Sequence, residues 1–237
     1  MFNQFNPRSV TFNILFLNIL VFIAANVLNG HQDPYTGSHF QVSETALLYG
    51  ALHYPGSPDF KPVQFITYMF LHQEFLHIFG NMFGLFMFGS ILERVWGPKR
   101  FFVFYFITGF GAALVNLAVQ SYGVYRIAGT LFPDQELISH SLQLSNIYAS
   151  QMLGASGAIF GILVAFGMLF PNMELLLLFF PVPIKAKYII TGYVCYEIFQ
   201  QIANKPTDHV AHIAHLGGAV VGFILVKIWN GNRNQLY

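Results

Sequence analysis

The sequence has few charged residues and almost no cysteine. Only 9% of its 237 residues are Asp, Glu, Lys or Arg, whereas a soluble globular domain carries about 25%. The chain is 55% hydrophobic with a mean hydropathy of +0.54, which is more apolar surface than a soluble core of this length buries. Its single cysteine, Cys195, excludes a disulfide framework and a multi-cysteine metal site. We therefore expect a lipid bilayer to be the solvent.

The chain also has no large excess of positive or negative charge. The chain has 11 basic and 10 acidic residues, so it lacks the basic surface that a nucleic-acid partner requires. Its length suits one helical bundle, and we expect residues 1–237 to form a single membrane domain.

Six apolar segments approach the roughly 20 residues that a helix needs to cross a bilayer. They are residues 10–28, 75–92, 101–119, 149–170, 186–202 and 210–229. The stretch 175–180 is too short to cross, and Pro181 and Pro183 end it. The predicted fold class is therefore an all-α membrane protein with six transmembrane helices.

Lysine and arginine in the connections predict the orientation, because cytoplasmic loops carry most of them. With a cytoplasmic N-terminus, the C-terminus is cytoplasmic too and eight of the 11 basic residues lie inside. These are Arg8, Arg94, Lys99, Arg100, Lys185, Lys187, Lys227 and Arg233, whereas Lys61, Arg126 and Lys205 lie outside. We expect a multi-pass protein of the plasma or inner membrane, with the long connections 29–74 and 120–148 outside.

Two reactive side chains fall at similar depth in this arrangement. Ser156 lies near the outer end of the fourth span and His215 near the outer end of the sixth. Both spans carry small residues at every third or fourth position, which lets membrane helices approach closely. A histidine within 2.6–3.2 Å would activate the serine hydroxyl. The pattern favours an intramembrane serine hydrolase, although either residue alone is more often structural.

Other polar residues leave alternatives open. His77 and Asn81 share a helical face and offer hydrogen-bond donors for an oxyanion, but together with His72 they could only join loop to helix. The run His209–His212–His215 invites a metal site, yet its i, i+3 spacing turns the side chains apart, and we expect no carboxylate or thiolate nearby to complete a shell. We expect no metal and no other cofactor.

Glu197 in the fifth span has two interpretations. It is either a proton-relay acid or, with Gln200 and Gln201, part of a face against a wet interface. We favour the second. The connection 203–209 is expected to be a movable cover over the site, with Tyr196 and Phe199 packing the fifth span beside it.

The motifs together resemble the rhomboid family of intramembrane serine proteases over nearly the whole chain. The matching elements, in order, are Gln64-Phe65-Ile66-Thr67, His72-x4-His77-x3-Asn81, Glu93-Arg94-Val95-Trp96-Gly97, Gly154-Ala155-Ser156-Gly157, and Ala214-His215-Leu216-Gly217-Gly218 with Gly222. Their order, and the placement of the polar ones on spans two, four and six, make the match specific.

The resemblance implies residue roles and a substrate class. Ser156 would be the nucleophile and His215 its general base, a dyad with no acidic third member. His77, Asn81 and the backbone N–H of Ser156 would form the oxyanion hole, with Gly154, Gly157, Phe160, His72, Gly218 and Gly222 supporting the site. The implied fold is a six-helix bundle, and single-span transmembrane proteins would be cleaved near its outer face.

Two positions depart from the family's pattern. Val63-Gln64 stands where well-known bacterial members have tryptophan-arginine, which questions the lipid anchoring of the first external loop. Phe160 replaces a tyrosine that stacks on the histidine in many members. The alternative functions are an inactive rhomboid-like protein that binds membrane clients, and a transporter or channel. Inactive members normally lose the serine or the histidine, and both are present in this chain. Transporters often contain broken helices repeated in two matching halves, and this sequence has no such repeat.

Overall fold

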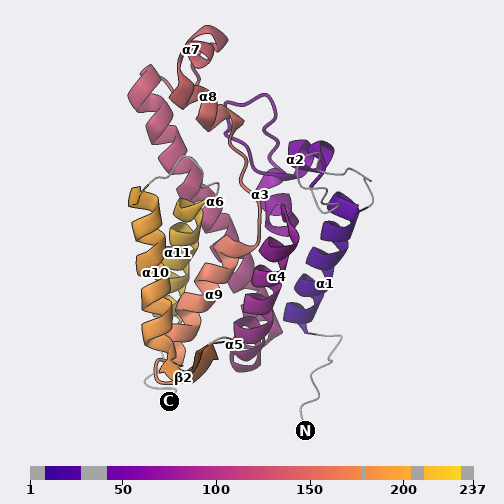
Figure 1. Ribbon diagram of the computed structural model, residues 1–237, viewed down its shortest axis with the longest axis vertical. Helices are drawn as coiled ribbons and strands as arrows, with labels where there is room; N and C mark the ends of the chain where they lie inside the picture. The colour runs from indigo at the N-terminus through magenta and orange to yellow at the C-terminus, as the bar shows by residue number, and fades with distance from the viewer. Residues whose placement is uncertain (1–8, 28–41, 178–179, 204–210, 231–237) are drawn as a thin grey trace.

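The structure is a computed structural model that describes residues 9–27, 42–177, 180–203 and 211–230. It is an all-α membrane fold with one small hairpin (Figure 1). Helices occur at all six predicted positions. They are α1 Val10–Phe22 with a π-helical turn to Val27, α4 Phe75–Gly84 continuing through a π-helical turn into α5 Ser90–Trp96, α6 Pro98–Ala128, α9 Ser156–Leu169, α10 Ala186–Ala203 and α11 His212–Asn230.

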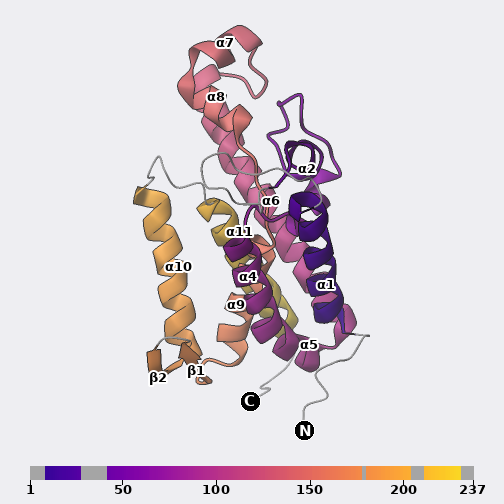
Figure 2. The same ribbon diagram turned by 45° about the vertical axis from the view of Figure 1, so that its right-hand side comes forward.

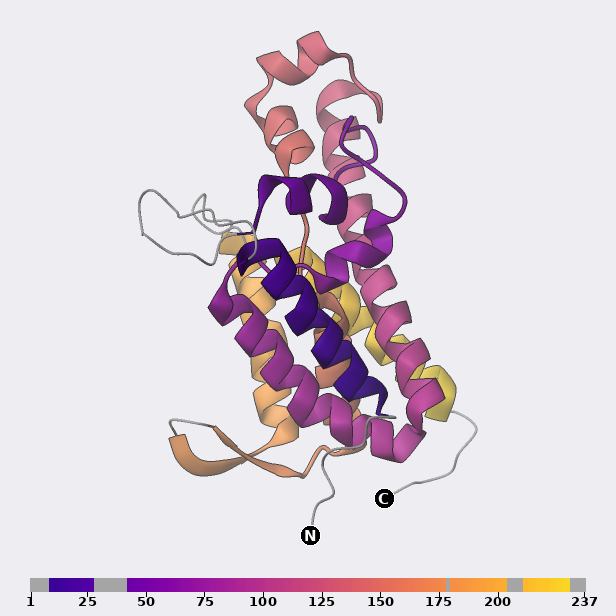
Figure 3. The ribbon, with the colours of Figure 1, turned by 90° about the vertical axis from the view of Figure 1, so that its right-hand side faces the viewer.

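Three of these helices are long and apolar enough to cross a membrane by length and composition. They span Phe75–Trp96, Pro98–Ala128 and His212–Trp229, while the helices at Val10–Asn26 and Ser156–Leu169 are shorter. α1 begins and α11 ends at the same end of the bundle (Figures 1 and 3).

Two predicted span boundaries are wrong. The fourth helix begins at Ser156 and not at residue 149, because residues 150–155 form an irregular segment that pairs with the first long connection through Leu52 and Met152. The third helix continues past residue 119 to Ala128, where Gly129 ends it with a positive φ of 69°. Its 31 residues extend about 46 Å, which exceeds a hydrocarbon core of about 30 Å. The predicted loop 120–148 is therefore largely helical.

Shorter elements occupy the connections. The first long connection contains α2 Glu44–Gly50, α3 Gln64–Thr67 and the 3-10 turn Tyr68–Phe70, and the second contains α7 Gln135–His140 and α8 Leu142–Ala149. α7 and α8 lie beside the protruding end of α6 (Figure 1). Two strands, β1 Glu174–Leu177 and β2 Phe180–Lys185, pair in antiparallel fashion before α10, and the sequence did not predict them.

The centre of the bundle is α9, which packs against both α11 and α6, and these two helices also pack against each other (Figures 1 and 2). Most of its side chains are buried. α9 meets α11 backbone to backbone, since a methyl group at Gly218 would lie 1.8 Å from the carbonyl oxygen of Gly157. A methyl group at Gly222 would lie 2.7 Å from the Cα of Gly161. The predicted close approach of these two helices is therefore confirmed.

A side-chain cap fastens α1 at the periphery of the bundle. Glu93 on α5 caps the start of α1, accepting hydrogen bonds from the Ser9 hydroxyl and from the backbone N–H groups of Val10 and Thr11 at 2.7–2.8 Å. An acidic side chain is favourable at a helix N-terminus because of the helix dipole. The cap holds α1 against α5 at the end of the bundle remote from the start of α9.

Candidate active site

Ser156 is the first residue of α9, and the backbone before it is shaped by glycine. Gly154 has a φ of 116°, which side-chain-bearing residues rarely adopt, and its N–H donates to the carbonyl of Tyr68 at 2.9 Å. This conformation turns the chain into the helix at Ser156. The first N–H groups of a helix have no partner within it and carry partial positive charge. Ser156 thus presents a hydroxyl and an N–H at a site suited to developing negative charge.

The structure brings Ser156 and His215 into contact. The Ser156 Oγ and the His215 Nε2 are 2.7 Å apart, although 59 residues separate them in sequence. His215 is buried on α11 and its ring lies flat against Phe160, with centroids 4.4 Å apart and planes at 11°. The stacking fixes the ring plane and aims Nε2 at the hydroxyl.

The other nitrogen of His215 meets a carboxylate. Its Nδ1 is 2.9 Å from Oε2 of Glu197 on α10, and Nδ1 of His212 is 2.6 Å from the same oxygen. Glu197 is only 2% exposed. A carboxylate accepts hydrogen bonds, so Nδ1 of His215 carries the proton and Nε2 keeps its lone pair toward Ser156.

The preferred interpretation of Glu197 was therefore wrong, and so was the expected absence of an acidic residue beside the histidine. Glu197 does not face a wet interface. One helical face carries Glu197, Gln200 and Gln201. The sequence could not show that Glu197 accepts hydrogen bonds from two histidines of α11.

Glu197, His212 and His215 also form a group with the residue types of a metal site, with ligand atoms within 4.8 Å of one another. Glu197 therefore lies beside His212 and His215, and the expectation of no carboxylate near them is wrong. The distances of 2.6 and 2.9 Å are nevertheless those of hydrogen bonds. Ligands at about 2.0–2.1 Å in a tetrahedral zinc shell would lie about 3.3 Å apart. His209, the third histidine of the run, lies outside the described residues.

His77 faces the start of α9 from α4. A methyl group at Gly154 would lie 2.7 Å from the His77 Nε2 and 3.7 Å from the Ser156 Oγ, so the imidazole and the hydroxyl flank the same glycine. The Nδ1 of His77 accepts a long hydrogen bond of 3.5 Å from the N–H of Gln73. A neutral ring used in this way carries its proton on Nε2 and can donate it toward the serine.

His72 and Asn81 complete the polar cluster. Asn81 is buried one helical turn after His77 on α4. The ring of His72 lies 5.0 Å from that of His77 at 67°, and neither nitrogen has a hydrogen-bond partner among the described residues. Burial first, and the neighbouring His77 second, lower the pKa of His72 to about 3, so His72 is uncharged. It therefore adds no charge beside the serine.

The predicted supporting glycines lie where the helices meet. A methyl group at Gly157 would lie 2.6 Å from the Cβ of Ala112 on α6, and Gly218 abuts Gly157 itself.

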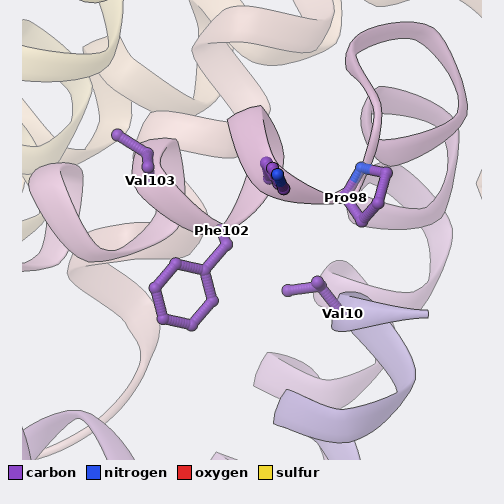
Figure 4. A pocket seen from close by; sticks show the side chains of 5 residues that line it. Val10, Pro98, Phe102 and Val103 are labelled. Atoms are coloured by element: carbon purple, nitrogen blue, oxygen red, sulfur yellow. The ribbon is translucent and has the colours of Figure 1, made fainter. Parts of the chain in front are cut away.

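An apolar surface hollow between the start of α1 and the start of α6 is remote from Ser156 and His215 (Figure 4). Val10, Pro98, Lys99, Phe102 and Val103 line it.

Comparison with known proteins identifies the relationship. The model of the Rhomboid domain matches residues 59–230, which include every residue of the Ser156–His215–Glu197 group and of the His72–Asn81 cluster. The chain belongs to the rhomboid family.

Individual rhomboid relatives are distant. The mitochondrial Rhomboid protein 1 of Saccharomyces cerevisiae is 30% identical over 162 residues, covering 68% of this chain and 40% of that protein. The mitochondrial RHOMBOID-like protein 12 of Arabidopsis thaliana is 27% identical, and the match covers 92% of this chain and 58% of that protein. The Rhomboid protease AarA of Providencia stuartii is 27% identical, and the match covers 92% of this chain and 71% of that protein. This rhomboid chain thus covers only 40% and 58% of the lengths of the first two of these relatives.

The two departures from the rhomboid pattern have structural answers. Phe160 does stack on His215, so the missing hydroxyl does not prevent that contact. Gln64 is fully buried and ties together the connection between α1 and α4. Its amide donates to the carbonyls of Leu48 and Asp59 at 3.1 and 2.9 Å, and its Oε1 accepts from the N–H of Lys61 at 3.0 Å. Val63 beside it is 55% exposed.

Proposed function

We propose that this rhomboid chain is an intramembrane serine protease that cuts single-span transmembrane proteins near the outer face of a membrane. The observation that carries the proposal is the 2.7 Å contact between the Ser156 Oγ and the His215 Nε2. The nucleophile and its base both lie on packed helices of a membrane protein.

The proposed reaction follows from the two atoms in contact. The Ser156 oxygen attacks the carbonyl carbon of the scissile peptide while its proton moves to the His215 Nε2. The carbonyl oxygen becomes an oxyanion, stabilised by the N–H of Ser156 and by donors from His77 and Asn81. The proton then passes from His215 to the leaving nitrogen and the C–N bond breaks. Water, deprotonated by the same base, hydrolyses the acyl-enzyme and regenerates the serine.

The finer topology belongs to the same proposal. α1, α4 with α5, α6, α9, α10 and α11 are proposed as six transmembrane helices of one domain, in the plasma or inner membrane, with both chain termini cytoplasmic. The distribution of lysine and arginine supports this orientation. Reporter fusions at the two termini and within residues 129–134 test it. An outside signal from either terminus would contradict it.

A purified, detergent-solubilised protein tests the activity. We expect it to cleave some members of a panel of single-span substrates and to react with a fluorophosphonate probe at Ser156. Ser156→Ala and His215→Ala should abolish both, with unfolding midpoints near that of the wild type. Full residual cleavage by Ser156→Ala would refute the proposal. Chelators should leave the rate unchanged, and loss with EDTA followed by recovery with zinc would instead favour a metal enzyme.

A further inference from the structure

The outer half of α10 has one deeply buried side chain among its described residues, and that side chain is charged. The buried residues of this helix are Ala186, Ile190 and Glu197, and the first two lie in its opening turns. Around Glu197, the side chains of Tyr196, Ile198 and Phe199 are 44–64% exposed. Apolar packing therefore contributes little to holding this half of the helix against the bundle.

The hydrogen bonds of Glu197 hold it instead. The carboxylate accepts from Nδ1 of both His212 and His215. A buried carboxylate is costly unless such partners are present, so moving α10 away would leave it without them. Tyr193, which is 45% exposed, adds a second contact near Glu197, because its ring lies 4.9 Å from that of Phe160.

The same contact selects the tautomer of the base. With Glu197 in place, Nδ1 of His215 is protonated and Nε2 can accept the serine proton. Without an acceptor at Nδ1, the proton can reside on Nε2, where it blocks general-base chemistry. In serine proteases with a buried aspartate, replacing that residue by its amide lowers kcat about 10⁴-fold for this reason.

We propose that Glu197 is a positioning residue that orients His215 and sets its tautomer, and that it does so only while the outer half of α10 is docked on α11. The inference rests on the proposed function, since it concerns the base of that reaction. It makes the position of one helix a condition for activation of Ser156.

The first test uses Glu197→Gln, which keeps the shape of the side chain and removes its charge. With a short soluble peptide as substrate, we expect kcat to fall roughly ten- to thousandfold with KM changed less than threefold, and fluorophosphonate labelling of Ser156 to slow in parallel. The unfolding midpoint should stay near that of the wild type. Ile198→Ala, an exposed neighbour on α10, is the matched control and should keep the wild-type rate.

The second test follows the helix. Cys195 is the chain's single cysteine, is exposed, and lies two residues before Glu197, so a nitroxide spin label there reports on α10 without further engineering. Glu197→Ala should make the label measurably more mobile, whereas Ser156→Ala should leave its spectrum unchanged.

The outcomes separate this inference from the proposed function. A wild-type protein that neither cleaves nor labels would refute the proposed function. An active wild type with an equally active Glu197→Gln would overturn the positioning role alone. An unchanged spectrum for Glu197→Ala would overturn the link to helix docking.

Discussion

At the scale of single residues, the orientation of His215 depends on two flanking groups, a ring on its face and a carboxylate on its edge. Phe160 supplies the ring at 4.4 Å. Phe160→Leu keeps an apolar side chain but removes a stacking contact of about 0.5–1.5 kcal/mol. We expect kcat to fall about tenfold, because the imidazole is then free to rotate. Phe160→Tyr restores the ring and should remain within about twofold of the wild type. Equal rates for the leucine and tyrosine variants would exclude an orienting role for stacking.

Asn81 gives a second prediction at this scale. The oxyanion exists only along the reaction path, so a donor to it accelerates turnover without strengthening substrate binding. Asn81→Ala should lower kcat by roughly tenfold to several hundredfold, and KM should stay nearly constant. Steady-state kinetics with a peptide substrate checks this. A rise in KM at constant kcat would place Asn81 in substrate binding instead.

The sequence predicted the residues whose surroundings are local and missed the one whose partners are not. Ser156 and His215 were found because glycines accompany each of them along the chain, and close helix packing follows from such glycines. Glu197 has no such local signal. Whether it faces lipid, water or another helix depends on the rotation of α10 about its axis, and only the tertiary structure fixes that.

At the scale of elements, the contact between α9 and α11 sets the distance between Ser156 and His215. Gly218→Ala would place a methyl group 1.8 Å from the Gly157 carbonyl oxygen, which forces the helices apart. We expect a loss of about 1–3 kcal/mol in stability and at least about a hundredfold loss in rate, since a 1 Å displacement at a reacting group costs that much. Gly192→Ala on α10, where a methyl group meets nothing within 4 Å, is the control.

Thermal unfolding and peptide cleavage are measured for both glycine variants. The Gly192→Ala protein should be as stable as the wild type or more stable by about 1 kcal/mol, because alanine favours helices. If Gly218→Ala cleaves at the wild-type rate, the backbone contact does not control the serine–histidine distance.

Element positions were predictable, but several boundaries were not. Apolar runs predicted a helix at each of six places, because backbone groups in a bilayer must pair internally. The start of α9 depends on the positive φ of Gly154 and on pairing with Leu52, which are tertiary features. Residues 120–128, which extend α6, are less apolar than the span before them, and the apolar run of β1 fits a strand or a helix equally well by hydropathy alone.

At the scale of the whole molecule, α10 is the least enclosed of the helices that form the site. The residues expected to pack it were chosen wrongly, since Tyr196 and Phe199 are 51% and 64% exposed. Tyr193 contacts Phe160 instead. The expected cover, residues 203–209, lies almost entirely outside the described residues.

A substrate helix that reaches the site through the lipid must pass a neighbour of α9 and α11. Around Glu197, α10 contacts α11 through the Glu197 carboxylate and α9 through the Tyr193 ring. Tyr193→Ala should therefore loosen α10 with opposite consequences for two substrates. A short soluble peptide should be cleaved more slowly, because His215 is oriented for a smaller fraction of the time. A membrane-embedded substrate loses the same fraction but gains access, as expected where gating limits turnover. The ratio of the two rates should rise at least threefold in favour of the membrane substrate.

Tyr196→Ala, which removes an exposed ring on the same helix, should leave the ratio unchanged. An unchanged ratio in Tyr193→Ala would mean that substrates reach Ser156 by a route that does not displace α10.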